Sequence, residues 1–152
     1  MSQIIHMKVE SLANQKWVYL TFIYAFNVIQ DRVPLWQKLK CFAARIRGPW
    51  AVGGDFNCVL DHIERCGGSS SKAEIEHFKN CMVECGMLDI RAIGSLFTWN
   101  NKRRPEDRTY SRLDRFMVNQ DWCDLFPDMF AHFLPEGNYD HTPCIVSSNK
   151  HT

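Results

Sequence analysis

The order of apolar and polar positions along the chain predicts a mixture of strands and helices. Residues 16–24 are rich in aromatic and β-branched side chains and predict a strand buried on both faces. Residues 31–45 place apolar side chains, Val33 among them, at helical spacing, with Pro34 near the start, where a helix tolerates proline. Residues 50–57 predict a short apolar strand that runs into two glycines and then into polar side chains, as strands that end at a site do.

The second half of the chain continues this alternation with shorter elements. A second amphipathic helix is predicted from Ser71, a cap residue, to Gly86, with Val83 among its inward positions. Four short strands and one helical turn are expected after it: strands at 88–90, 97–99, 111–118 and 144–146, and the turn at 121–126. Because helices and strands alternate without βαβ regularity, we expect an α/β layered fold with mixed sheets, in one domain over residues 1–152.

Composition narrows the class of protein but does not identify a function. The chain has 152 residues, 45% of them hydrophobic, which suits one soluble domain, and its net charge of +1 gives no general attraction to nucleic acid. The seven cysteines stand singly without a CxxC pair, which favours reduced thiols and gives no zinc signature. With neither a signal peptide nor an apolar span recognisable, we expect an intracellular protein, nuclear or cytoplasmic, with no membrane partner.

Three places combine polar side chains with positions suited to a site: Asp55 with Asn57, Asp114, and Asp140 with His141. An aspartate after two glycines is more often a turn residue than a catalyst, and an Asp-His pair before Thr-Pro is usually part of a loop. Asp114 differs, because it lies inside an apolar strand, where an unpaired carboxylate is costly. It therefore needs a cationic or hydrogen-bonding partner.

The order of several motifs carries a resemblance to a known family. They are Gly54-Asp55-Phe56-Asn57, Gly94-Ser95-Leu96-Phe97-Thr98-Trp99-Asn100, Ser111-Arg112-Leu113-Asp114-Arg115, Asn119-Gln120-Asp121-Trp122 and Asp140-His141-Thr142-Pro143. Together they resemble the endonuclease/exonuclease/phosphatase (DNase I-like) superfamily, in the branch of plant LINE-type non-LTR retrotransposons. Upstream, Tyr24 with Arg32 is similar to the tyrosine strand of that branch. The resemblance implies a DNase I-like layered α/β sandwich of mixed sheets flanked by helices.

The same resemblance implies metal-dependent hydrolysis of a phosphodiester, with DNA as the substrate. By position, Asp55 would orient or deprotonate the attacking water, and Asn57 would hold the phosphate and the water in line. His141 would contact a phosphate oxygen and share in proton transfer, while Asp114 fixes the orientation of its ring. Tyr24 would contact the phosphate or the leaving oxygen.

Asp140 would lie beside the metal, which is expected to be magnesium, with manganese as the alternative. The run Lys102-Arg103-Arg104 has two interpretations. It is either an ordinary solvated turn or a contact to the DNA phosphate backbone. Trp99 and Trp122 are expected in the core rather than as base-stacking platforms. A reverse transcriptase of the parent element is an implied partner.

The chain departs from the family pattern in two ways. Neither the family's first strand with its asparagine nor the later glutamate, its principal metal ligand, is recognisable; Glu10 stands in a different context. We therefore expect a partial domain in which the front strands are missing. Tyr139 replaces a serine and is expected to crowd the site. Besides a DNA endonuclease, the sequence leaves open a non-catalytic remnant that binds nucleic acid or protein, and a phosphoesterase of the same superfamily.

Overall fold

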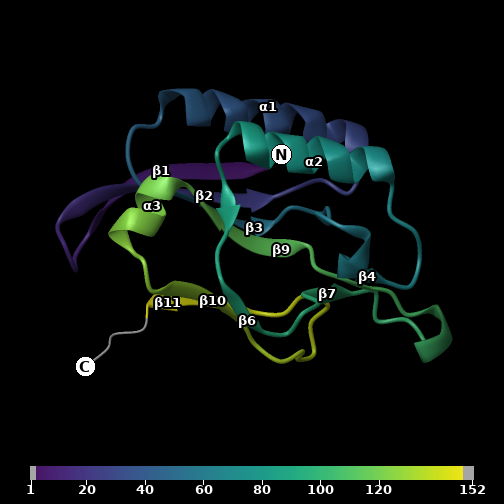
Figure 1. Ribbon diagram of the computed structural model, residues 1–152. Helices are drawn as coiled ribbons and strands as arrows, with labels where there is room; N and C mark the ends of the chain where they lie inside the picture. Colours follow the sequence, from purple (N-terminus) through teal and green to yellow (C-terminus); the bar gives the residue numbers. More distant parts are fainter. Residues whose placement is uncertain (1–2, 149–152) are drawn as a thin grey trace.

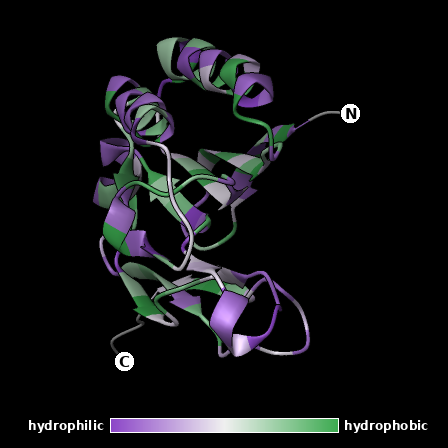
Figure 2. Ribbon diagram, turned by 90° about the vertical axis from the view of Figure 1, so that its right-hand side faces the viewer, coloured by the Kyte–Doolittle hydropathy of each residue, from purple (hydrophilic) through white to green (hydrophobic). Residues whose placement is uncertain are grey.

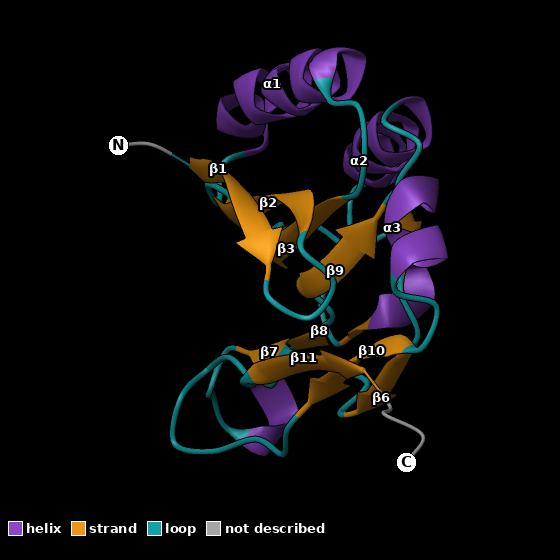
Figure 3. Ribbon diagram, turned by 90° about the vertical axis from the view of Figure 1, so that its left-hand side faces the viewer, coloured by secondary structure: helices purple, strands orange, loops and turns teal. Residues whose placement is uncertain are grey.

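A computed structural model describes residues 3–148, and in them helices and strands lie in layers (Figure 1). Helices α1 (Ile29–Arg45) and α2 (Lys72–Glu84) lie side by side over one face of a central sheet. A second layer of strands lies on the opposite side of that sheet, away from the helices (Figure 3). The predicted fold class, a layered α/β sandwich with mixed sheets and flanking helices, is confirmed.

The central sheet is mixed and has five strands in the order β1-β2-β3-β9-β5. Their bounds are β1 Ile4–Ser11, β2 Lys16–Tyr24, β3 Trp50–Asp55, β9 Asp114–Val118 and β5 Leu88–Asp89. β2 and β3 are parallel, with α1 as the crossover between them, and the other neighbouring pairs are antiparallel. The sheet thus brings β3 and β9, far apart in the sequence, to its centre.

The second layer contains two three-stranded sheets. One has the order β11-β10-β6, and its strands are β11 Cys144–Ser148, β10 Met129–Phe133 and β6 Ala92–Gly94. The other has the order β4-β8-β7, and its strands are β4 Arg65–Cys66, β8 Tyr110–Ser111 and β7 Trp99–Asn100. The remaining elements are helix α3 (Gln120–Leu125) and two 3-10 turns, His62–Glu64 and Pro105–Asp107.

Alternation along β3 decides which side chains enter the core. Trp50, Val52 and, just beyond the strand, Phe56 lie under the helices and are at most 1% exposed. Ala51 points to the opposite face, where it packs with Trp122 of α3. The helices carry hydrophobic residues among hydrophilic ones, as amphipathic helices over a sheet do (Figure 2).

Two details of the predicted helices are wrong. Helix α1 begins at Ile29, before the predicted start, and both valines expected to point inward are exposed, Val33 by 40% and Val83 by 73%. The buried stripe of α1 runs through Leu35, Trp36 and Leu39, and the valines lie beside the buried stripes of their helices rather than in them. The serine cap was placed correctly, since Ser71 accepts a hydrogen bond from the backbone of the first turn of α2.

The predicted strand 111–118 divides into two strands of different sheets. At the break, the amide of Arg112 donates to Glu64 O over 2.9 Å, and Leu113 O accepts from Phe56 N over 3.0 Å. The first bond extends the β4–β8 ladder by one residue and the second extends the β3–β9 ladder, so the chain passes here from β8 in the second layer to β9 in the central sheet. The predicted strand 97–99 overlaps the observed β7 only at Trp99, because β7 begins two residues later and ends one residue later. Strands β1, β4, β6 and β10 were not predicted.

Strand β2 is not buried on both faces as predicted. Val18, Thr21 and Ile23 are buried, but Phe22 is 45% exposed and Tyr24 is 65% exposed. Phe22 pairs with Ile5 of β1, which is 62% exposed. The second layer therefore leaves this part of the β1–β2 face uncovered in the described part of the chain.

Asn119 joins three segments at the end of the central sheet. Its side-chain oxygen accepts hydrogen bonds from Trp50 N over 2.9 Å and from Trp122 N over 3.0 Å, and its amide group donates to Gly48 O over 2.9 Å. It is thus the N-cap of α3 and also fixes the start of β3. The Asn-x-x-Trp motif has a structural basis in these contacts.

We predict that Asn119→Ala lowers the free energy of unfolding by about 2–3 kcal/mol, because a helix cap and two further hydrogen bonds are lost together. Gln120→Ala is the matched control, since the adjacent Gln120 is exposed and bonds only within its own helix. Urea unfolding of both variants measures the effect. Equal midpoints for the two variants would contradict the structural role of Asn119.

Candidate active site

Three of the predicted site residues form a row across neighbouring strands. Tyr24 at the end of β2 pairs in register with Asp55 at the end of β3, and Asp55 pairs with Asp114 at the start of β9. Side chains in register point to the same face of a sheet. The row therefore faces the second layer, on the side opposite the helices.

His141 reaches this row from the second layer. Its ring atom Nδ1 lies 2.9 Å from Asp114 Oδ2, and Nε2 lies 3.8 Å from Asp55 Oδ2. The backbone of His141 forms a β-bridge with Trp99. The imidazole thus lies between two carboxylates, and Asp114 has the hydrogen-bonding partner that its position in the strand requires.

Thr98 holds the two halves of this arrangement together, and sequence reasoning did not assign it a role. Its hydroxyl oxygen accepts hydrogen bonds from Leu113 N over 3.0 Å and Asp114 N over 2.9 Å. Its carbonyl oxygen accepts from Thr142 N over 2.8 Å. Thr98 is fully buried, so these bonds are shielded from water. The only signal in the sequence was its place in the Phe-Thr-Trp motif.

The turn after β3 gives Asn57 an uncommon backbone conformation. Asn57 has φ +50°, a left-handed conformation that asparagine tolerates better than most residues. Its amide N–H donates to Asp55 Oδ1 over 2.8 Å, and its side-chain nitrogen donates to Ala25 O over 3.0 Å and Asn27 Oδ1 over 2.6 Å. The turn thereby fixes both Asp55 and Asn57 at the end of the sheet.

A buried arginine supports this turn from the helix side. Arg32 in α1 is 1% exposed, donates to the carbonyl oxygen of Asn57 and forms an ion pair with Glu74 of α2. A buried guanidinium requires such partners, because an unpaired charge away from water is strongly unfavourable. Arg32 therefore links both helices to the loop that carries Asn57.

A pocket of about 350 Å³ lies over the row. The residues that line it are Tyr24, Asn27, Asp55, Asn57, Arg65, Trp99, Leu113, Asp140 and His141. Five of the six predicted catalytic residues are among them, and the sixth, Asp114, contacts Nδ1 of His141. Asn27, Arg65 and Trp99 were not predicted to be there. Trp122 is in the core, as expected, whereas Trp99 is only half-buried and lines the pocket.

The basic run does not line this pocket. Lys102 forms an ion pair with Glu136 and donates to Gly137 O over 3.3 Å, so it joins two loops of the second layer. Arg103 and Arg104 are exposed on the same loop as Lys102. Tyr139 does not crowd the site as expected, because it is 77% exposed and is not among the lining residues.

Burial and a neighbouring carboxylate raise the proton affinity of Asp55. Burial, with Asp114 as the second cause, raises the pKa of Asp55 to about 6. The hydrogen bond to Asp114, together with the charges of Asp114, Asp55 and Asp140, raises the pKa of His141 above its usual value. Near neutral pH the pocket thus combines a carboxylate base with an imidazole that is easily protonated.

The described residues do not assemble a complete metal site. In residues 3–148, no three His, Cys, Asp or Glu side chains come together in a group that could hold a metal ion. Asp140 is exposed at the rim of the pocket, and Asp55 is committed to the amide of Asn57 and lies close to His141. The described side chains therefore support no chemical step through a metal.

No helix in the described part of the chain is both long and apolar enough to cross a membrane, and the seven cysteines are free. The cysteines therefore contribute no cross-link to the site.

We predict that the free energy of unfolding falls as the pH rises through the range from 4 to 6, and that Asp55→Asn removes this fall. The folded-state pKa of Asp55 is about 6, above its value of 3.8 in an unfolded chain, so ionisation disfavours the folded state. By pH 7.5 the variant should be more stable than the unmodified protein by about 2–3 kcal/mol. Urea unfolding at pH 4.5 and 7.5 measures the difference.

Asp128→Asn is the control for this prediction, since that carboxylate is exposed and takes part in no described ion pair. If Asp55→Asn has the same pH dependence as Asp128→Asn, the site does not disfavour the charged form of Asp55.

No protein-family model and no curated protein matches the chain. Among solved structures it is similar to the endonuclease domain of TRAS1, a telomere-specific non-LTR retrotransposon, with a TM-score of 0.67 and 16% identity over 99% of this chain and 65% of that one. It is also similar to the 3′ phosphatase NExo from Neisseria, solved with a product DNA hairpin, with a TM-score of 0.66 and 16% identity over 87% and 61% of the two chains.

The catalytic domain of Xenopus laevis APE2 matches with a TM-score of 0.59 and 13% identity over 97% of this chain and 56% of that one. The chain thus spans 56–65% of the length of these three domains. At such low identity the likeness concerns the fold. The chain has the DNase I-like fold of endonuclease/exonuclease/phosphatase domains.

Proposed function

We propose that this chain belongs to a DNA endonuclease domain of the plant LINE-type retrotransposon branch and that its pocket hydrolyses a phosphodiester. The observation that carries the proposal is the position of His141 between Asp114 and Asp55 at the wall of a polar pocket. A histidine oriented by one carboxylate beside a second, perturbed carboxylate is an acid and base pair in contact.

In the proposed reaction, water attacks phosphorus while the bond to the leaving oxygen breaks, and the leaving oxygen takes up a proton from the solvent. Asp55, with a pKa of about 6, accepts the proton of the water near neutral pH. His141, whose pKa is raised, is protonated in part and donates to a phosphate oxygen, which offsets the developing negative charge. Tyr24 and Asn57 line the same pocket, where they contact the phosphate and limit its orientation.

DNA as the substrate rests on the motifs and on the fold. The TRAS1 domain is an endonuclease of a non-LTR retrotransposon, and the Neisseria 3′ phosphatase was solved with product DNA, so this fold accommodates such substrates in other proteins. We extend the proposal to a nuclear or cytoplasmic setting, a reverse transcriptase of the parent element as partner, and a partial domain whose front strands are missing.

Magnesium, or manganese in its place, is part of the proposal as a requirement for full activity. Asp140 at the rim is the carboxylate proposed to contact it, and the ion would offset negative charge on the phosphate. Because the described side chains do not complete a metal site, a second function deserves a test. In that alternative, the chain binds nucleic acid without cleaving it.

We predict that purified protein nicks supercoiled plasmid in magnesium, and that Asp55→Ala and His141→Ala each lower the rate by about 100-fold or more, as loss of an acid or base group does. Asp128→Ala and His77→Ala are matched controls, since both residues are exposed and lie outside the pocket. A gel assay of relaxed plasmid, with a chelator lane, measures the rate.

Folded protein that binds DNA but gives no nicking would instead support the non-catalytic function. Nicking that survives in both pocket variants would indicate a contaminating nuclease and would remove the basis of the proposal. Release of phosphate from small esters without nicking would assign the pocket to a phosphoesterase.

We further predict that Asp114→Asn lowers the pKa of His141 and slows nicking, because the hydrogen bond and charge of Asp114 stabilise the imidazolium. Titration of the imidazole signals by NMR measures the first effect, with His77 as an internal reference. The expected loss of nicking is about 10- to 100-fold, smaller than for His141→Ala. An unchanged His141 titration would show that Asp114 does not tune this ring.

A further inference from the structure

Arg65 contributes positive charge to the wall of the candidate pocket. Of the residues lining that pocket in the described part of the chain, it is the one arginine or lysine. Asp55 and Asp140 line the same pocket, so an anion would be repelled there without a cation. The run Lys102-Arg103-Arg104, for which the sequence suggested a phosphate contact, does not line this pocket.

The guanidinium of Arg65 is held in place without being neutralised. Nε donates to Ser111 Oγ over 3.0 Å, and Nη1 donates to Ser69 O over 2.9 Å. Both acceptors are uncharged, and Arg65 forms no ion pair with a carboxylate in residues 3–148. Nη2 is left without a described acceptor. The positive charge of this pocket-lining side chain is therefore not paired with a carboxylate, and its Nη2 group is free to donate.

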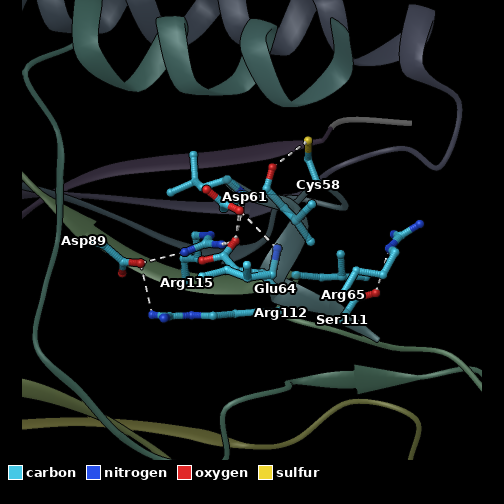
Figure 4. Close-up of polar contacts among 12 residues, drawn as sticks. Cys58, Asp61, Glu64, Arg65, Asp89, Ser111, Arg112 and Arg115 are labelled. Carbon is cyan, nitrogen blue, oxygen red and sulfur yellow. Dashed lines mark hydrogen bonds and ion pairs between the residues drawn. The ribbon is translucent and has the colours of Figure 1, made fainter. Parts of the chain in front are cut away.

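The contacts of the nearby acidic side chains explain why they do not neutralise the charge of Arg65. Glu64, the preceding residue, directs its carboxylate to the buried Arg115 and to the amide of Leu60. Asp89 is shared by Arg112 and Arg115. Figure 4 shows these ion pairs grouped on one side, with Arg65 and Ser111 at the other end. The carboxylates of the network are thus paired with arginines other than Arg65.

The backbone under Arg65 is equally well fixed. Arg65 and Ser111 are register partners in the β4–β8 ladder. The loop that supplies Ser69 O begins at Gly67, where φ is +79° and an added Cβ would lie 2.6 Å from Arg108 O. Only glycine permits this close approach. Pre-positioning lowers the entropy that a long side chain loses when it binds a ligand.

We propose that Arg65 forms a phosphate-binding subsite, in which its Nη2 group donates to a backbone phosphodiester in the substrate strand. A charge-assisted hydrogen bond from a guanidinium to a phosphate oxygen is stronger than one between neutral groups. Ser69 O and Ser111 Oγ act as positioning groups that aim the donors. The subsite rests on the proposed function, because it assigns to the same pocket the contact that holds the strand beside His141.

The test measures binding separately from cleavage. Fluorescence anisotropy of a labelled 20-base-pair duplex, in chelator and at several KCl concentrations, gives Kd and its salt dependence. We expect Arg65→Ala and Arg65→Gln to weaken binding about tenfold and to lower the salt slope by about one charge. Arg65→Gln keeps a donor for Ser111 or Ser69. Weaker binding by this variant is therefore due to the lost charge rather than to a change in the fold. Arg65→Lys should retain the slope with weaker binding.

Arg47→Ala is the matched control, since Arg47 also donates to backbone carbonyls, those of Ala44 and Ile46, and is exposed outside the pocket. Salt slopes of both neutral Arg65 variants that equal that of Arg47→Ala would overturn the subsite, as would a wild-type protein that does not bind the duplex. Arg65-dependent binding without plasmid nicking in magnesium would support the subsite and reject hydrolysis. Plasmid nicking by a protein whose DNA binding does not depend on Arg65 would support hydrolysis and reject the subsite.

Discussion

The hydroxyl of Thr98 is the contact on which the geometry of the site depends. Two consecutive amides, those of Leu113 and Asp114, donate to it where the chain leaves one sheet for another. The same residue receives the amide of Thr142 through its carbonyl oxygen. One buried side chain thus sets the distance between the strand that carries Asp114 and the loop that carries His141. A residue without this hydroxyl would leave two buried donors unpaired, which costs about 1–3 kcal/mol for each.

Buried arginines support the site from the other side of the sheet. Arg32 ties Asn57 to α2 through Glu74, and Arg115 ties the 3-10 turn and β5 to the back of β9 through Glu64 and Asp89. Both guanidinium groups are at most 2% exposed, so their partners are required for burial. Loops that would otherwise be mobile at the end of the sheet are therefore held by ionic contacts with the layer beneath.

The sequence predicted the layered fold and most of the pocket, and the errors have physical causes. Asp55, Asn57 and Asp114 were recognisable because polar residues at strand ends stand out against apolar strands. Strand β1 was missed because none of its residues is fully buried. Strand β10 is an apolar segment of five residues, too short for its periodicity to separate a strand from a helix. Arg65 and Asn27 could not be assigned, since nothing local in the sequence distinguishes them from surface residues. Only the pairing of β4 with β8 and the turn at Asn57 place them in the pocket.

The alternation in β3 links the site to the core in a way that bears on the evolution of this chain. Asp55 faces the pocket, and its neighbour Phe56 is fully buried under the helices. A one-residue insertion or deletion in β3 would exchange the two faces, placing a carboxylate under the helices and a phenyl ring in the pocket. Selection for folding alone therefore opposes such changes. The spacing around Asp55 would persist in a descendant even after cleavage had ceased to matter, so an intact spacing records the history of the fold rather than current activity.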